Sequence, residues 1–159
     1  MNRLFACLGR FAVIVFGFFC ASLAASAFLH RLVSGVVGLT GEEVTALMSG
    51  PALVSVPLVA LFIGYFAFVP ALPFMAAAEV LGRRDWLFHA LCGGGVSLVI
   101  VGLHFVVDDG GRPVGPFLAS LFVGTGLVGG IAYWAVAGRN AGLLLYGPDG
   151  ATGPERSGS

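Results

Sequence analysis

Four long apolar runs occupy most of this 159-residue sequence. They cover approximately residues 11–33, 52–81, 86–107 and 116–138. An α-helix rises about 1.5 Å per residue, so about 20 apolar residues cross a hydrocarbon layer about 30 Å thick. Each run reaches that length. The runs therefore predict an all-α membrane protein, an antiparallel four-helix transmembrane bundle that forms a single domain over about residues 1–145.

The composition agrees with a chain that is surrounded by lipid. Hydrophobic residues make up 58% of the chain and charged residues 10%, whereas soluble domains carry roughly 25% charged residues. A soluble domain with so few charges could not cover its surface with polar groups. The formal net charge is zero, so no basic field is present to attract nucleic acid. We expect the lipid bilayer as a partner, together with other membrane proteins or self-association, and no nucleic acid.

The arginines predict the orientation of the helices, because cytoplasmic segments of membrane proteins carry an excess of basic residues. All eight basic residues are arginines. With the N-terminus inside, most of them fall in cytoplasmic segments: Arg3, Arg10, Arg83, Arg84, Arg139 and Arg156. Arg31 and Arg112 fall in outer segments. We therefore expect a multi-pass protein of the bacterial inner (plasma) membrane with both termini in the cytoplasm.

The first run has two interpretations. Two arginines, an apolar stretch and the sequence Ala25-Ser26-Ala27 are typical of a secretory signal peptide with its cleavage site, which would leave three spans. The apolar stretch is longer than such a peptide requires, and Gly17, Ala21 and Ala25 form a small-residue stripe suited to helix packing. We favour a retained helix, with cleavage as the alternative.

Polar segments connect the runs and end the chain. Thr40 and Glu43 have the spacing of a capping box, and apolar residues follow at helical spacing. They predict a short interfacial helix over about residues 42–49, on the outer surface of the membrane. Residues 146–159 lack apolar periodicity and are rich in glycine, proline and serine, which predicts a disordered tail.

Small residues indicate the faces on which the helices pack, because lipid provides no hydrophobic drive between helices and small side chains let backbones approach. Gly126 and Gly130 form a GxxxG step in the fourth run. The packing residues that we expect are Gly17, Ala21, Ala25, Gly95, Gly102, Gly126 and Gly130.

A few polar side chains in the runs are candidates for chemistry. His30 and His104 each lie about 20 residues from the inner end of their run, so we expect both near the outer interface. Two histidines at one depth can ligate a b-type haem, and the alternative is interfacial histidines whose polar edges face the headgroups. Glu79 precedes Arg83 by four residues, which predicts an ion pair on the surface of one helix.

Sequence signals of catalysis are absent. The chain has no phosphate-binding loop, no H-E-x-x-H or G-x-S-x-G motif, and its three cysteines show no CxxC spacing. No ionisable residue lies in the middle of a run, where a proton-coupled transporter needs one. We therefore expect no enzyme, no catalytic or metal-binding residue, and no cofactor.

The leading functional hypothesis is a non-enzymatic integral membrane protein that serves as an accessory or scaffolding subunit of a membrane protein assembly. The alternative is a small transporter or channel. Pro70 and Pro73 support it, because each removes a helical hydrogen bond and together they predict a bend near residues 69–74. A weaker alternative is a haem-bearing electron carrier that uses His30 and His104.

Two stretches of the second half carry a resemblance to a known group. They are residues 76–91 (AAAEVLGRRDWLFHAL) and residues 129–142 (GGIAYWAVAGRNAG). The chain resembles small four-span inner-membrane proteins of alphaproteobacteria, in which a charged turn before Trp-Leu-Phe precedes the third helix and a Tyr-Trp signature closes the fourth. The resemblance implies a four-span topology and a bacterial origin. It implies no activity, because none is established for that group.

Overall fold

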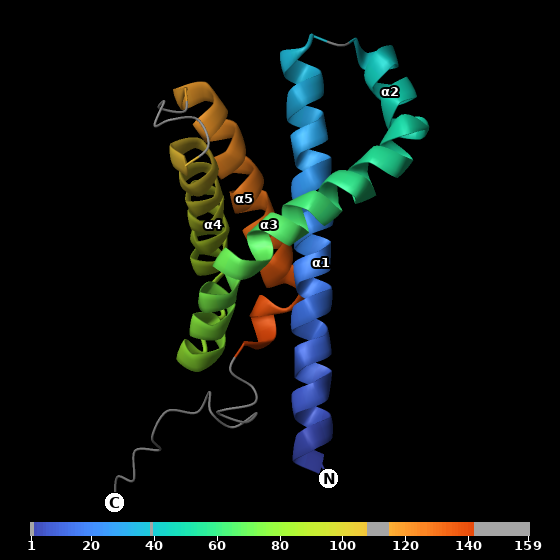
Figure 1. The fold of residues 1–159 in the computed structure, drawn as a ribbon. Coiled ribbons are helices and arrows are strands. Elements are labelled where there is room, and N and C mark those ends of the chain that lie inside the picture. The colour runs from blue at the N-terminus through green and yellow to red at the C-terminus, as the bar shows by residue number, and fades with distance from the viewer. Residues whose placement is uncertain (1, 39, 108–114, 142–159) are drawn as a thin grey trace, which may run out of the picture.

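This computed structural model describes residues 2–38, 40–107 and 115–141, which form helices joined by short turns (Figure 1). The helices are α1 (Asn2–Val36), α2 (Gly41–Ser49), α3 (Pro51–Leu81), α4 (Trp86–Val107), α5 (Pro116–Val136) and the short 3₁₀ helix η1 (Gly138–Asn140). Four of them, α1, α3, α4 and α5, are long and apolar enough to cross a membrane. The expected fold class is confirmed, because four long apolar helices pack together and a short helix lies between α1 and α3.

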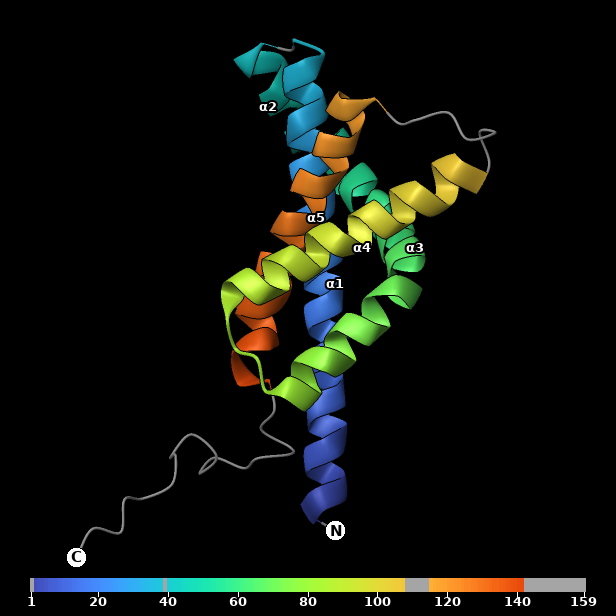
Figure 2. The ribbon, with the colours of Figure 1, turned by 90° about the vertical axis from the view of Figure 1, so that its left-hand side faces the viewer.

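The long helices are arranged around α1 and α5. Helix α5 packs extensively against both α4 and α1, whereas α3 packs against α1 and touches α4 over a shorter stretch. Figures 1 and 2 show that α3 crosses α1 at a slant and then bends toward the turn that leads to α4. Pro57, Pro70 and Pro73 lie inside α3, and each removes a helical hydrogen bond, which accounts for a bent helix.

Proline and glycine determine where the spans begin and end. Pro51 and Pro116 occupy the first position of α3 and α5, respectively. A backbone N–H at this position has no partner within the helix, so proline can replace it without loss of a helical hydrogen bond. Gly82 ends α3 with a φ of 58°, a left-handed conformation that favours glycine. Beyond it, the Arg83 N–H donates to the Ala78 carbonyl at 3.1 Å. The chain then turns directly into α4.

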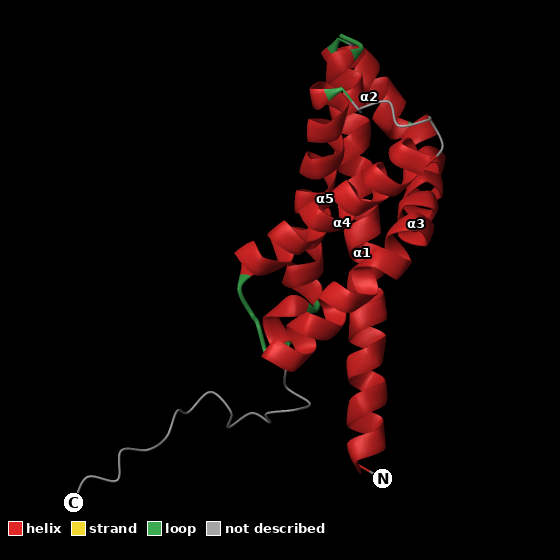
Figure 3. Ribbon diagram, turned by 60° about the vertical axis from the view of Figure 1, so that its left-hand side comes forward, coloured by secondary structure: helices red, strands yellow, loops and turns green. Residues whose placement is uncertain are grey.

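Helix α1 extends beyond the apolar run from which we predicted it. The run covers about residues 11–33, whereas the helix covers Asn2–Val36, which is 35 residues. Hydropathy marks the segment that suits lipid, but arginine, leucine and alanine are all good helix formers, so the helix continues through Arg3 and Arg10. Figures 1 and 3 show that the first turns of α1 stand clear of the other helices.

The N-terminus of α2 is held by Thr40 and Glu43. The Thr40 backbone N–H and the Thr40 hydroxyl both donate to Oε2 of Glu43, each at 2.8 Å. These bonds hold the pKa of the Glu43 carboxyl below its usual range, and the bond from the backbone N–H has the larger effect. The ionised carboxylate is therefore part of the helix start, as a capping box requires.

Many of the residues buried between the long helices are small. The buried residues of α3 are all alanines: Ala52, Ala60, Ala67, Ala71 and Ala78. Large apolar side chains of the same helix are exposed, such as Leu53 and Val69. In a membrane these outward faces contact lipid tails, which are as apolar as the side chains themselves.

Some predicted features lie outside the described residues. They are the tail over residues 146–159, the outer arginine Arg112 and the side chain of His104. The expectations for them remain predictions.

Candidate functional site: a cavity beside a buried ion pair

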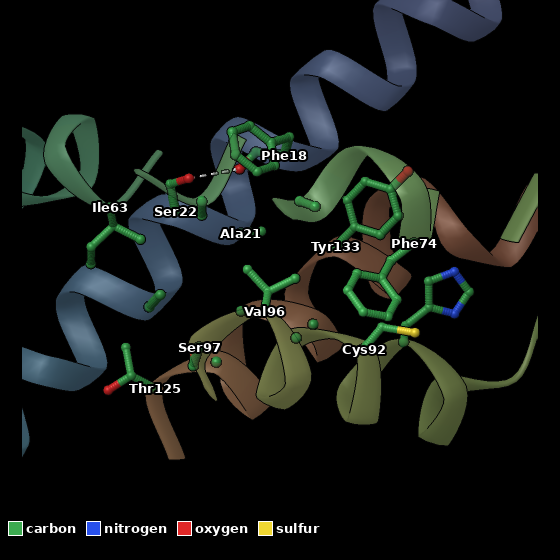
Figure 4. A pocket seen from close by; sticks show the side chains of 18 of the residues that line it. Phe18, Ala21, Ser22, Ile63, Phe74, Cys92, Val96, Ser97, Thr125 and Tyr133 are labelled. Carbon is green, nitrogen blue, oxygen red and sulfur yellow. Dashed lines mark hydrogen bonds between the residues drawn. The ribbon is translucent and has the colours of Figure 1, made fainter. Parts of the chain in front are cut away.

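A cavity of about 120 Å³ lies between the four long helices (Figure 4). Its lining includes Ala21 from α1, Ala67 and Ala71 from α3, Val96 from α4 and Thr125 from α5. Ala21, Ala67 and Ala71 have short side chains, which leave space between the helices at this point. The sequence predicted the small residues but not the cavity, which depends on how four helices are placed together.

Two of the hydroxyl groups in the lining, those of Ser22 and Thr125, are engaged within their own helices. The Ser22 hydroxyl donates to the Phe18 carbonyl at 3.1 Å, as the dashed line in Figure 4 shows. The Thr125 hydroxyl donates to the Leu121 carbonyl at 2.8 Å. Because these groups are already hydrogen-bonded to the backbone, both side chains offer the cavity mainly their carbon atoms.

A buried ion pair lies close to the cavity, at the end of the bundle where α3 turns into α4. Arg10 on α1 is 8% exposed and Glu79 on α3 is 19% exposed. Nε of Arg10 donates to Oε1 of Glu79 at 3.0 Å, and Nη2 of Arg10 contacts the same oxygen. The same Nη2 also donates to the Ala137 carbonyl at 3.0 Å. One guanidinium therefore connects α1, α3 and the C-terminal end of α5.

This ion pair corrects the expectation for Glu79. A pair with Arg83 at a spacing of four residues requires a helix that continues to Arg83. Helix α3 ends at Leu81, and the left-handed Gly82 then redirects the chain. Arg83 is instead largely exposed and lies 3.6 Å from Asp85.

His89 is a buried polar residue in the cavity lining whose surroundings the sequence did not predict. It is 4% exposed, and its Nδ1 lies 2.9 Å from the Asp85 carbonyl. A carbonyl accepts hydrogen bonds, so Nδ1 is the donor in this contact. Among the residues that the structure describes, Nε2 has no hydrogen-bond partner. A Cβ on Gly138 would lie 2.8 Å from this nitrogen, so a glycine at this position leaves room for the imidazole ring. The centre of the imidazole ring lies 5.8 Å from the centre of the Tyr133 ring.

His30 connects α1 to α3. Its Nδ1 lies 2.9 Å from the Ser26 carbonyl and its Nε2 lies 3.0 Å from the Ser55 hydroxyl. The carbonyl must accept, so Nδ1 donates and Nε2 accepts from Ser55. For His30 to ligate a haem, one of these bonds must break. The haem hypothesis with His104 remains a prediction, and the described residues contain no group of three or more metal-ligating side chains.

Gly126 and Gly130 lie at a close approach of α4 and α5. A Cβ on Gly126 would collide with the Ser97 hydroxyl and the Gly93 carbonyl, and a Cβ on Gly130 would collide with the His89 carbonyl. A backbone carbonyl lies in the way at both glycines, so a change of side-chain conformation cannot relieve the collision.

The other predicted packing residues lie in different surroundings. A Cβ on Gly17 would lie 2.8 Å from a methyl group at the end of α5, and Ala21 and Ala25 are buried. A Cβ on Gly95 would make an ordinary contact at 3.8 Å, and one on Gly102 would meet no described atom within 4 Å. On α4 the close approach is therefore at Gly93 rather than at these two glycines.

Comparison with known proteins identifies neither a family nor a taxon, so the resemblance to alphaproteobacterial proteins remains a prediction. What the structure shows is a small protein with four helices able to span a membrane. No family model, no curated protein and no solved structure matches the chain.

Proposed function

We propose that the chain is a non-enzymatic accessory or scaffolding subunit of a membrane protein assembly in the bacterial inner membrane. The observation that supports this proposal is the N-terminal arm, which we define as residues 2–9 of α1. The arm stands clear of the bundle (Figure 3), and its Phe5 and Leu8 side chains are 69% and 66% exposed. These two residues are three positions apart, so they share one face of the helix.

The length of α1 explains why the apolar surface of the arm is left for a partner to bury. Helix α5 has 21 residues, a length of about 31 Å that matches the hydrocarbon layer. Helix α1 has 35 residues, or about 52 Å. Since Gly17 of α1 packs against the end of α5, the turns of α1 that precede Gly17 extend past that end. Tilting α1 brings part of its extra length back into the hydrocarbon layer. The arm is the part of α1 that lies farthest from that layer.

An apolar helix that leaves the hydrocarbon layer is stabilised by a partner that covers it. Large exposed apolar surfaces of this kind mark interaction sites. A second membrane protein with an apolar helix at the same level fits the arm, because the chain contributes no charge between Arg3 and Arg10. We therefore assign the arm the role of attachment, and the bundle the role of anchoring it in the membrane.

The double variant Phe5→Ser, Leu8→Ser tests this role. Native mass spectrometry of membranes solubilised in mild detergent reports the mass of the assembly. We expect the unchanged chain in a larger assembly and the double variant as a single chain. The matched control is Val36→Ser, which changes a similarly exposed apolar residue at the other end of the same helix.

The control must keep the assembly if the arm is the attachment site. A single chain in the unchanged protein, or an assembly that survives the double variant, would overturn the proposal. If the mass shows further copies of this chain in place of a second protein, the arm mediates self-association.

A further inference from the structure

The cavity between the four helices has no part in the proposed attachment role. We propose that it is a binding site for the end of one acyl chain of a membrane lipid. This inference goes beyond the proposed function and does not depend on it, because the part of α1 that lines the cavity is separate from the arm.

The chemistry of the lining favours an apolar occupant over water. A buried water needs two to four polar partners. The Ser22 and Thr125 hydroxyls already donate to carbonyls of their own helices, and the His89 Nδ1 donates to the Asp85 carbonyl. The His89 Nε2 lies next to Gly138 and is the one polar atom of the lining that is both buried and without a hydrogen-bond partner among the described residues. Ser97 and Tyr133 add two hydroxyls to a lining that is otherwise mostly carbon, and Figure 4 shows these two residues well apart. A water molecule beside either hydroxyl therefore has few other polar partners.

The volume fits a short apolar segment. At about 120 Å³, the cavity is slightly smaller than an engineered apolar cavity of roughly 150 Å³ that stays dry and takes up benzene. An empty cavity of this size leaves the atoms of Ala67, Ala71 and Val96 without dispersion contacts on one side. The end of an acyl chain restores these contacts and carries no polar group of its own that would lose its hydration.

The lining reaches the outer surface between α3 and α4. These two helices touch over a shorter stretch than α4 and α5 or α1 and α5. Ile63 of α3 and Ile100 of α4 both line the cavity and are both partly exposed. In a bilayer this seam faces lipid tails, so an acyl chain reaches the cavity sideways, without passing through water.

A photoreactive lipid tests the assignment. The full chain is placed in phosphatidylcholine vesicles that contain phosphatidylcholine with a diazirine at the end of one acyl chain. After illumination, mass spectrometry of peptides locates the cross-links. We expect cross-links on Val96 and Thr125, which are 8% and 6% exposed, as well as on the outward-facing Leu98.

Two neighbouring residues of α3 provide a matched pair of variants. Ala71→Phe fills the cavity and should abolish the cross-links on Val96 and Thr125 while those on Leu98 remain. Leu72→Phe adds bulk at an exposed neighbour and should leave all of them unchanged. If Ala71→Phe does not fold, the cross-links of the unchanged protein still test the proposal. Labelling of Leu98 without labelling of Val96 or Thr125 would overturn the proposal, as would inward labelling that survives in a folded Ala71→Phe variant.

Discussion

The Arg10 guanidinium joins three segments of the chain, so its replacement tests what a buried charge contributes. Arg10→Met keeps much of the side-chain volume but removes the guanidinium that contacts the Glu79 carboxylate. Removing one partner of a buried pair costs about 3–5 kcal/mol. We expect a loss of unfolding free energy toward the lower end of that range, because Glu79 is 19% exposed and solvent still reaches it. Reversible unfolding in mixed detergent micelles measures the loss.

Arg83 and a compensating variant provide the controls for that experiment. Arg83→Met removes a largely exposed pair with Asp85 and should cost at most about 1 kcal/mol. Adding Glu79→Met to Arg10→Met also removes the buried carboxylate and should restore most of the lost stability. Equal losses for Arg10→Met and Arg83→Met would contradict a structural role for the buried pair.

The sequence identified ionisable residues but not their partners. Glu79 and Arg10 are 69 positions apart, and nothing in the spacing of either residue indicates the other. The local alternative, Arg83, satisfied the helical spacing and still proved wrong, because the helix ends between the two residues. Side-chain pairing across a bundle follows from helix placement, and only local pairs can be judged from spacing.

At the scale of elements, the contact between α4 and α5 depends on glycine. Gly126→Leu or Gly130→Leu places a side chain where the Gly93 or His89 carbonyl already lies. Overpacking costs about 1–3 kcal/mol, and backbone contacts on both sides favour the upper end. We expect lower thermal stability and lower yield in detergent for either variant.

Gly102→Leu is the control for these variants. It introduces the same side chain on α4, where a Cβ meets no described atom within 4 Å. It should behave as the unchanged protein. If Gly126→Leu and Gly130→Leu are as stable as Gly102→Leu, the close approach of α4 and α5 is not a requirement of the fold.

The sequence predicted small-residue faces more easily than it predicted their register. The GxxxG step of α5 does lie against another helix, but the partner glycine is Gly93 rather than Gly95 or Gly102. A stripe of small residues shows which face can be approached. The crossing point depends on both helices and on the tight turn at Gly82, so it is not encoded in one stripe.

At the scale of the whole molecule, the number of spans was predictable and their exact lengths were not. Apolar runs of about 20 residues determine how many times the chain can cross a bilayer. The arm of α1 was missed because Arg3 within it and Arg10 directly after it lower hydropathy without ending a helix. The cavity was missed because it results from the mutual placement of four helices, to which no single run corresponds.

The distribution of arginines predicts which end of the bundle faces the cytoplasm. Arg10, Arg84 and Arg139 donate to the carbonyls of Ala137, Ala141 and Ala135, so all three gather at the C-terminal end of α5.

Trp134 lies at this same end of the bundle. Its indole N–H donates to the Arg84 carbonyl at 2.6 Å, as an interfacial aromatic residue would. Arg31 lies near the opposite end of α1. Basic residues concentrate on the cytoplasmic side, so we expect the end that carries Arg10 to face inward.

Reporter fusions measure this orientation directly. Fusions after Ser34, Arg84, Arg112 and the C-terminus should report outside, inside, outside and inside in turn, because each long helix reverses the side. Replacing Arg83 and Arg84 by glutamine weakens the charge asymmetry and should give a mixture of orientations at the C-terminal fusion. An outside report from the C-terminal fusion of the unchanged chain would contradict the predicted orientation. Mass-spectrometric detection of a mature chain that starts at Phe28 would instead show cleavage, which removes Arg10 and with it the ion pair to Glu79.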